Sequence, residues 1–436
     1  MDNATFSSPD LDAFCMLDRL GLTAPGQRLE QDQAVLQCRS REPDPWCRAC
    51  GTKGVAVGMV PRPLAHGPLG WRPTLLQVRV RRYRCEHCQL VWREDLDQAA
   101  APRSKLTRHA VLWALKALVM DRMSISRIAT ALGVAWHTVN TAVLDLGHQL
   151  LIDDPSRFDG VRVIGVDEHV WRHAPGRDRF VTVIIDLTPI REATGPSRLL
   201  DMVPGRSKKV LATWLNEQPP GFRDGVEVVA MDGFTGFKTA AAEQLPAAVA
   251  VMDPFHVVAL AGDALDRCRQ RIQQQTRGHR GRSGDPLYGI RRTLRTGVDL
   301  LTGRHCDRLT SVFATDQHAA VEATWGIYQR IVQANRRDNR ATGKQELSSV
   351  ISALAKDVPA ALSEVTTLGR TLKRRAEDVL AYFDRPGTSN GPTEAINGRL
   401  EHLRGTALGF RNLAHYITRA LLDTGGFRPA QHPQLR

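Results

Sequence analysis

Apolar residues follow two different periods along the chain, and the changes of period divide it into segments. In the stretch TLLQVRVRRYRC, Leu76, Val78 and Val80 alternate with polar neighbours, as in a half-buried β-strand. Over residues 125–143 the apolar positions recur at three- and four-residue steps, interrupted by Gly133. This spacing predicts two helices joined by a tight turn at the glycine, the arrangement of a helix-turn-helix.

Beyond residue 160, short apolar runs alternate with helical ones, which is typical of an α/β fold. Strands are predicted for VRVIGVD, RFVTVIIDL, SRLLDMV, VEVVAMD and AAVAVMD. Helices are predicted for SKKVLATWLNEQ, for residues 234–244 and from Phe255 onward. We therefore expect a mixed sheet covered by helices. Residues 273–387 have a mostly helical pattern rich in arginine, which predicts a helical insertion.

Three of the predicted strands end in an aspartate, namely Asp167, Asp232 and Asp253. Ligands gather at strand ends in open α/β sheets, and carboxylate oxygens there hold Mg²⁺. Asp253 also stands directly before Pro254, as a helix N-cap residue stands before a proline at the first helical position. Two interpretations of Asp253 therefore stay open, a helix cap and a metal ligand.

Another acidic residue of interest lies far downstream, after the glycine-proline break at residues 391–392. Glu394 falls in the first turn of a predicted helix, and Asn397 and Glu401 lie one and two turns along the same face. A carboxylate in a first turn is also favoured by the helix dipole alone. The residue pattern thus leaves Glu394 open as a site residue or a helix-terminal charge.

Four of the eight cysteines have the spacing of zinc ligands. Cys47 and Cys50 form one C-x2-C pair, and Cys85 and Cys88 form another. Two such turns brought together by a β-ribbon supply the four soft ligands that Zn²⁺ prefers. We expect a zinc ribbon here, with His87 as an alternative donor in the second turn.

The charge balance points to a polyanionic partner. The formal net charge is +13, and the basic residues concentrate outside residues 151–260. The polar side of the second predicted helix, and the basic residues before the first, provide the expected DNA contacts: Arg103, Lys105, Arg108, His137, Thr138, Asn140 and Thr141. A pair of packed helices without DNA contact is the alternative interpretation.

Composition and hydropathy exclude two other classes of protein. Apolar residues make up 42% and charged residues 24% of the chain, as in folded globular proteins rather than disordered ones. The apolar stretch at residues 110–120 contains Lys116 and falls short of the roughly 20 residues needed to span a bilayer. The first ten residues are polar and acidic, unlike a secretory signal. We therefore expect a cytoplasmic protein with no membrane partner.

Over nearly its whole length the chain resembles bacterial insertion-sequence transposases of the ISL3 family. The segments that carry the resemblance are WCRACG, RRYRCEHC, the helix-turn-helix stretch, VIGVDEHVWR, VVAMDGFTGF, VMDPFHVV, DPLYGIRRTLRTG and SNGPTEAINGRLEHLRGTALGFRN. The resemblance implies an N-terminal zinc-binding domain, a helix-turn-helix, and a DDE catalytic domain of ribonuclease-H-like fold that contains a helical insertion.

The resemblance also implies the chemistry. The catalytic triad maps to Asp167, Asp232 and Glu394, which would hold Mg²⁺ or Mn²⁺. The expected partners are the double-stranded DNA of transposon ends and targets, with a homodimer or larger assembly in the synaptic complex on the nucleoid. Arg404 and Arg411 are expected near the bound DNA end. A DNA-binding regulator, or a nuclease of the same fold without strand transfer, remains as the alternative function.

The expected fold class is accordingly a multidomain α/β protein with five segments. These are a helical or loop segment (1–43), a zinc ribbon (44–98), a helix-turn-helix domain (102–152), a catalytic domain with a mixed sheet (160–272 and 388–425) and the helical insertion (273–387).

Overall fold

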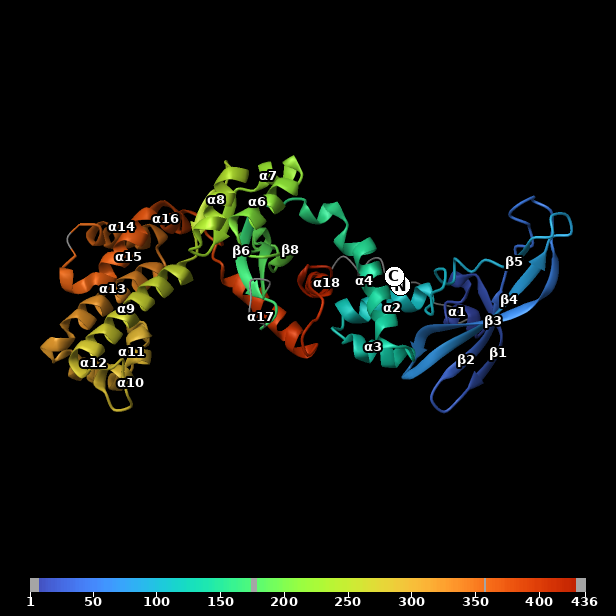
Figure 1. Cartoon of the computed structure of the whole chain (residues 1–436), viewed down its shortest axis with the longest axis horizontal. Coiled ribbons are helices and arrows are strands. Elements are labelled where there is room, and N and C mark those ends of the chain that lie inside the picture. Colours follow the sequence, from blue (N-terminus) through green and yellow to red (C-terminus); the bar gives the residue numbers. More distant parts are fainter. Residues whose placement is uncertain (1–7, 174–178, 357, 429–436) are drawn as a thin grey trace. The chain divides into compact units, whose positions relative to one another are not determined.

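The computed structural model describes residues 8–173, 179–356 and 358–428, and these divide into two compact units (Figure 1). The first unit combines Met1–Pro155 with Thr406–Arg436. The second unit is Ser156–Gly405. Both units contain strands as well as helices, which confirms the expectation of a multidomain α/β protein.

The first unit begins with a five-stranded sheet in the order β1-β2-β4-β3, with β5 paired to β4. Its elements are the short helix α1 (Leu11–Phe14) and the strands β1 (Leu22–Leu29), β2 (Ala34–Ser40), β3 (Val55–Leu69), β4 (Arg72–Arg84) and β5 (Val91–Arg93). The expectation of a helical or loop segment over 1–43 is therefore wrong. Strand β2 pairs with β4 and buries Leu36 and Cys38 in the same core as Leu76, Val78 and Val80, so it extends the sheet of the predicted ribbon.

Strands β3 and β4 form a long antiparallel hairpin. The pairing runs from Val55 with Arg84 to Leu69 with Arg72 at the tip. The tip is closed by Gly70, whose φ of +61° lies in the left-handed region that favours glycine. Along β4 the alternating residues Leu76, Val78 and Val80 are buried, as their period predicts.

Helices complete the first unit: α2 (Arg108–Val119), α3 (Ile125–Leu132), α4 (Trp136–Gly147) and α18 (Leu413–Thr424). Ser124 caps α3 through a hydrogen bond from the Arg127 amide, and Gly133 ends the helix with a φ of +64°. Two helices joined by a tight turn therefore lie where the sequence pattern predicts them.

Helix α18 packs in the first unit, whereas the sequence analysis places residues up to 425 in the catalytic domain. The Thr418 hydroxyl lies 3.0 Å from His148 Nε2, after α4. Leu422 packs against the backbone of Gly147, and Arg428 Nε donates to the Val119 carbonyl at 3.0 Å. Helix α18 and Arg428 thus pack against α2, α4 and the residues that follow α4.

The second unit is built on a mixed sheet in the order β10-β9-β6-β7-β8. Its strands are β6 (Val163–Val170), β7 (Phe180–Asp186), β8 (Arg198–Pro204), β9 (Val228–Met231) and β10 (Val249–Met252). Strands β6, β7 and β8 are antiparallel neighbours, whereas β9 and β10 run parallel to β6. Every strand falls on a predicted apolar run, although β6 continues three residues beyond Asp167.

The two faces of this sheet are covered by different helices. The helices of this region are α5 (Thr188–Arg191), α6 (Lys208–Glu217), α7 (Pro220–Gly225), α8 (Thr235–Gln244) and α17 (Gly391–Thr406). Ile164 and Val166 of β6 share a hydrophobic core with α6 and α8. Successive strand residues point to opposite faces, so Gly165 and Asp167 face the other side, where α17 lies (Figure 1).

A helical body follows β10. Its helices are α9 (Pro254–Arg277), α10 (Pro286–Gly289), α11 (Arg291–Arg295), α12 (Gly303–Phe313), α13 (Ala319–Arg336), α14 (Arg340–Leu354), α15 (Ser363–Arg374) and α16 (Ala376–Asp384). One hydrophobic core extends through this body from Val257 to Phe383. Helix α9 shares that core, so the body starts earlier than the predicted insertion, 273–387. No helix in the described ranges is long and apolar enough to cross a membrane.

Helix α17 approaches β6 so closely that a side chain at Gly165 has no room. A Cβ there would lie 2.7 Å from Thr393 Oγ1 and 3.2 Å from Asn390 Oδ1. Thr393 is fully buried at this contact. Glycine at 165 therefore sets the distance between the first turn of α17 and the strand that carries Asp167.

We predict that Gly165→Ala lowers the free energy of unfolding of the second unit by about 1–3 kcal/mol, because the added methyl group overpacks the contact with Thr393. The measurement is the urea midpoint. Gly398→Ala is the matched control, since this α17 glycine has open space around its Cβ position, and alanine there should stabilise the helix by up to about 1 kcal/mol. Equal midpoints for the Gly165 variant and the unmodified protein would contradict the packing argument.

Candidate functional site

Three aspartates lie in a row along one edge of the second unit's sheet. Val166 of β6 pairs with Met231 of β9, and Met231 pairs with Met252 of β10. Asp167, Asp232 and Asp253 are the next residues of these parallel strands. Neighbouring strands are about 4.8 Å apart, so the pairing alone brings the three residues side by side.

Asp167 occupies the centre of the site and is only 8% exposed. Its Oδ1 accepts a hydrogen bond from the Glu168 amide at 2.8 Å, and its Oδ2 accepts one from Asn397 Nδ2 at 3.0 Å. Burial raises the pKa of Asp167 to about 7, and the negative charges of Glu394 and Asp232 add to this effect. The carboxylates of Asp232 and Glu394 therefore both lie within electrostatic reach of Asp167.

Asp232 follows β9 in a loop whose shape depends on distant residues. Its Oδ1 accepts a hydrogen bond from the Phe234 amide at 2.9 Å. Arg375, from the helical body, donates through a terminal guanidinium nitrogen to the Gly233 carbonyl at 3.2 Å. The His256 ring lies so close to Gly233 that a Cβ there would be 2.5 Å from Nε2. Arg375 and His256 thus both contact Gly233, the residue that follows Asp232.

Asp253 connects the sheet edge to the helix that carries Glu394. It occupies the N-cap position of α9, directly before Pro254, but its side chain makes no capping hydrogen bond to that helix. Its Oδ1 also accepts a hydrogen bond from the Asn390 amide at 2.9 Å, and burial raises the pKa of this carboxyl. Glu394 lies one turn farther on and is exposed. Asp253 therefore fixes the start of α17 against β10.

The face of α17 that the sequence predicts to carry Glu394, Asn397 and Glu401 lies along β6. Asn397 contacts Asp167, and Glu401 Oε1 lies 4.0 Å from Nε2 of His169, the next residue on the same face of the strand. Burial lowers the pKa of His169 to about 4, so its ring is neutral at pH 7. Asn397 Oδ1 is buried and has no hydrogen-bond partner.

The three triad carboxylates are spread more widely than the ligands of a single ion. Across residues 8–173, 179–356 and 358–428, one set of at least three acidic, histidine or cysteine ligand atoms lies within a mutual 4.8 Å, and it is the set of four cysteines. Two ions about 3.5–4 Å apart require a wider arrangement of ligands than one ion does. At least one pair of ligand atoms among Asp167, Asp232 and Glu394 therefore lies more than 4.8 Å apart.

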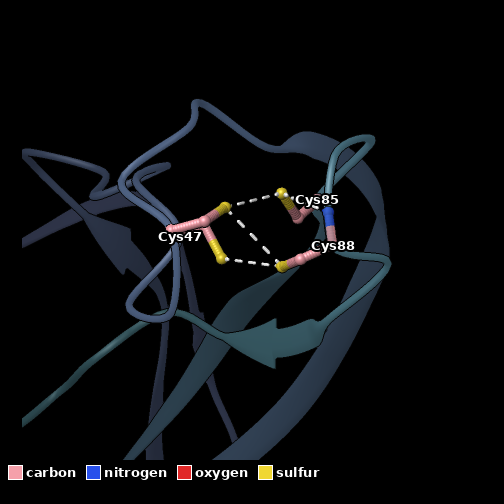
Figure 2. A group of neighbouring side chains, drawn as sticks. Cys47, Cys85 and Cys88 are labelled. Atoms are coloured by element: carbon pink, nitrogen blue, oxygen red, sulfur yellow. Dashed lines mark hydrogen bonds between the residues drawn. The ribbon is translucent and has the colours of Figure 1, made fainter.

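The four cysteines meet at the far end of the β3–β4 hairpin from its tip. Cys47 Sγ lies 3.5 Å from Cys88 Sγ, and Cys50 Sγ lies 3.4 Å from Cys85 Sγ (Figure 2). Contacts with Thr52 lower the pKa of Cys50 to about 6, which favours the thiolate that a metal binds. The cluster is compatible with a zinc ion, and its four sulfur atoms need no contribution from His87.

The residues predicted to contact DNA on α4 do not all lie on its surface. His137 and Thr141 are exposed and Thr138 is half-buried, but Asn140 is only 4% exposed. Asn140 lies on the buried helix face with Val143, three residues on, so the prediction of a DNA-facing Asn140 conflicts with the structure.

The predicted basic contacts also differ in their accessibility. Arg103, Lys105 and Arg411 are exposed. Arg108 is exposed as well, although its Nε donates to the Asp97 carbonyl at 2.6 Å. Arg404 forms an ion pair with Glu401, and its side chain is only 16% exposed. Arg404 therefore supports the α17 face rather than presenting a free guanidinium.

Comparison with known proteins identifies the family. The model of the ISL3 group of DDE transposases, described as a transposase, matches residues 164–420, more than half of the chain. The chain belongs to this family. It is 26% identical over 339 residues to the transposase of insertion sequence element IS1557 from two strains of Mycobacterium tuberculosis, covering 72% of either chain. It is 24% identical over 392 residues to the IS1001 transposase of Bordetella parapertussis, covering 85% of this chain and 86% of that one.

Family membership makes the protein an enzyme of the nuclease and transposase type, with DNA as its partner and a divalent metal as its cofactor. The matched range contains all three residues of the predicted triad. It also contains the helical body, which separates Asp232 from Glu394 along the chain.

Three residues around the site were not predicted as site residues. Asn397 has a sequence signal, because its i+3 position after Glu394 places it on the same helix face. His169 has a weaker one, its i+2 position after Asp167 in a strand. Arg375 has none, since only the folding of the helical body brings it to the Asp232 loop.

We predict that Asp253→Ala lowers the free energy of unfolding by about 1–3 kcal/mol, because it leaves the buried Asn390 amide without an acceptor. Asp253→Asn keeps an acceptor oxygen at the same place and should lose less than about 1 kcal/mol. Chemical denaturation of the two variants checks this. Equal large losses would show that the negative charge, rather than the acceptor, is required there.

Proposed function

We propose that this protein is a DNA transposase that binds the terminal inverted repeats of an insertion sequence and catalyses metal-dependent DNA cleavage and strand transfer. The observation that supports the proposal is that the negative charges of Asp232 and Glu394 both act on the buried Asp167, in a chain of this family. These residues are the proposed catalytic triad.

The strand order supports a ribonuclease-H-like catalytic domain. Three antiparallel strands, β6 to β8, are followed by β9 and β10, which add in parallel on the other side of β6. The chain then forms the helical body before α17 returns to β6. A DDE domain with a helical insertion would have the same order, with its acids on β6, directly after β9 and on α17.

The donor set fits divalent metal ions. The three carboxylates offer hard oxygen ligands, and the buried Asn397 Oδ1 without a partner adds an amide oxygen beside them. Asp167, Asp232 and Glu394 would hold the divalent ions, Mg²⁺ or Mn²⁺. Such ions polarise the scissile phosphate, lower the pKa of bound water and stabilise the leaving 3′ oxygen.

The protein's own groups orient the acids. The Asn397 amide holds one oxygen of Asp167 at 3.0 Å, and Arg375 holds the Asp232 loop through Gly233. Strand transfer needs no protein nucleophile, because the 3′-hydroxyl freed by cleavage attacks the target phosphate while the target's own bridging oxygen leaves. The enzyme's task is then to align DNA strands at fixed carboxylates.

DNA recognition is assigned to the first unit. The four-cysteine cluster at Cys47, Cys50, Cys85 and Cys88 is proposed to bind one Zn²⁺ and to shape the end of the hairpin. Helices α3 and α4 are proposed to act as a helix-turn-helix, with His137 and Thr141 exposed toward the DNA. The excess of basic residues supplies phosphate contacts.

We predict that Asp167→Asn abolishes Mg²⁺-dependent cleavage of a labelled end duplex, by on the order of a thousandfold or more, and leaves duplex binding nearly unchanged. Glu168→Gln is the matched control. Its carboxylate is exposed and paired with Arg206 at 3.1 Å, so that variant should cleave normally. Undiminished cleavage by Asp167→Asn would reject the proposed triad. Strand-transfer products formed by the unmodified protein would distinguish a transposase from a nuclease that only cuts DNA.

We predict that Cys85→Ser loses bound zinc and specific end binding, because metal binding supplies folding free energy in such small units. Cys306→Ser is the control, since this exposed cysteine lies outside the cluster and its loss should leave the zinc content at one ion per chain. The measurement is metal content by atomic absorption, together with gel-shift binding. A Cys85→Ser protein that keeps one zinc ion would count against the four-cysteine site.

A further inference from the structure

The tip of the β3–β4 hairpin exposes a large aromatic side chain. Trp71 is 100% exposed, and the neighbouring Arg72 is exposed as well. The strand pairing ends at Leu69 and Arg72, so Trp71 stands in the two-residue turn itself. An indole in this position contributes nothing to the core of the unit. Fully exposed tryptophan is uncommon in folded proteins and points to a partner.

The tip lies beside the turn between α3 and α4. A Cβ at Gly133, in that turn, would be 3.2 Å from Cβ of Pro73. Figure 1 shows this end of the hairpin reaching α3, while the cysteine end points the other way. Trp71 is two residues from Pro73, or about 7 Å along an extended chain. The hairpin tip therefore lies near the turn that precedes α4.

The surface formed by the two segments has the chemistry of a nucleic-acid contact. Neither 67–73 nor 133–138 contains an acidic residue. The first turn of α4 adds Trp136, 49% exposed, and the exposed His137. Backbone N–H groups at a helix start also favour phosphate. Exposed aromatic rings, a guanidinium and a helix N-terminus thus lie together on one side of the unit.

We propose that the hairpin tip is a second DNA contact, in which Trp71 and Arg72 enter the minor groove next to the major groove that receives α4. Arg72 would supply the cation that a narrow minor groove attracts, and the indole would act as an apolar wedge against the bases. A turn of two residues is narrow enough for a groove about 6 Å wide. This inference rests on the proposed binding of transposon ends by α3 and α4, and it adds a separate recognition element to it.

The test uses the full-length protein and a duplex that contains the element's terminal repeat, with a scrambled duplex for comparison. Trp71→Ala should weaken end binding roughly tenfold, as expected for loss of one base-contacting aromatic ring. Arg72→Ala should reduce the slope of log affinity against log salt by about one. Phe14→Ala, which removes another exposed aromatic ring of the first unit (78% exposed), should bind within twofold of the unmodified protein.

A direct readout accompanies the affinities. Duplex binding should shield Trp71 from acrylamide, so the tryptophan fluorescence of the unmodified protein should be quenched less when DNA is bound. In Trp71→Phe this DNA-dependent decrease in quenching should disappear. Because Trp71 makes no core contact, unchanged urea midpoints should accompany the weaker binding of Trp71→Ala.

The outcomes separate this inference from the proposed function. End binding by Trp71→Ala within twofold of normal, with unchanged quenching, would overturn the hairpin contact and leave the transposase proposal standing. The same holds if Trp71→Ala alters the protein's molecular mass in solution but not its DNA affinity, since the tip would then contact another copy of the chain. Failure of the unmodified protein to prefer the end duplex would overturn both.

Discussion

The close packing of α17 on β6 is the contact on which the rest of the catalytic unit depends. It brings together strand and helix residues more than two hundred positions apart, and it is possible because position 165 has no side chain. The buried Thr393 and the hydrogen bond from the Asn390 amide to Asp253 fix the start of the helix. One turn along, Asn397 then reaches Asp167 at 3.0 Å. The position of Asn397 relative to Asp167 therefore depends on the packing of α17 against β6.

Each acid of the site is supported by a part of the chain remote from it. Asp167 is held from α17, the Asp232 loop from the helical body through Arg375, and the Glu394 helix from the end of β10. Burial raises the pKa of Asp167, and repulsion by the negative charges of Glu394 and Asp232 raises it further. The fold supplies the mechanical support that keeps such a cluster together, and a divalent cation supplies the opposite charge.

Short-range sequence patterns predict much of this arrangement. Apolar runs predicted every strand of the mixed sheet, and C-x2-C spacing predicted the four-cysteine cluster, because both signals lie within a few residues. Strands β1 and β2 were missed because their apolar pattern is irregular and because β2 joins the sheet through β4, which is distant in the sequence. The sequence analysis also did not predict that Asn140 is buried or that Arg404 pairs with Glu401. Both depend on how the side chains pack in the folded protein, which the sequence pattern does not show.

The path of the chain between the units carries a consequence for its synthesis. The first unit is interrupted after Pro155 and resumes at Thr406, where α18 adds to the bundle containing α2 and α4. The catalytic unit is thus an insertion within the bundle that bears α3 and α4. A ribosome must synthesise the whole catalytic unit before α18 can close this bundle. A polypeptide that stops early in the catalytic unit consequently lacks the helix that completes the bundle.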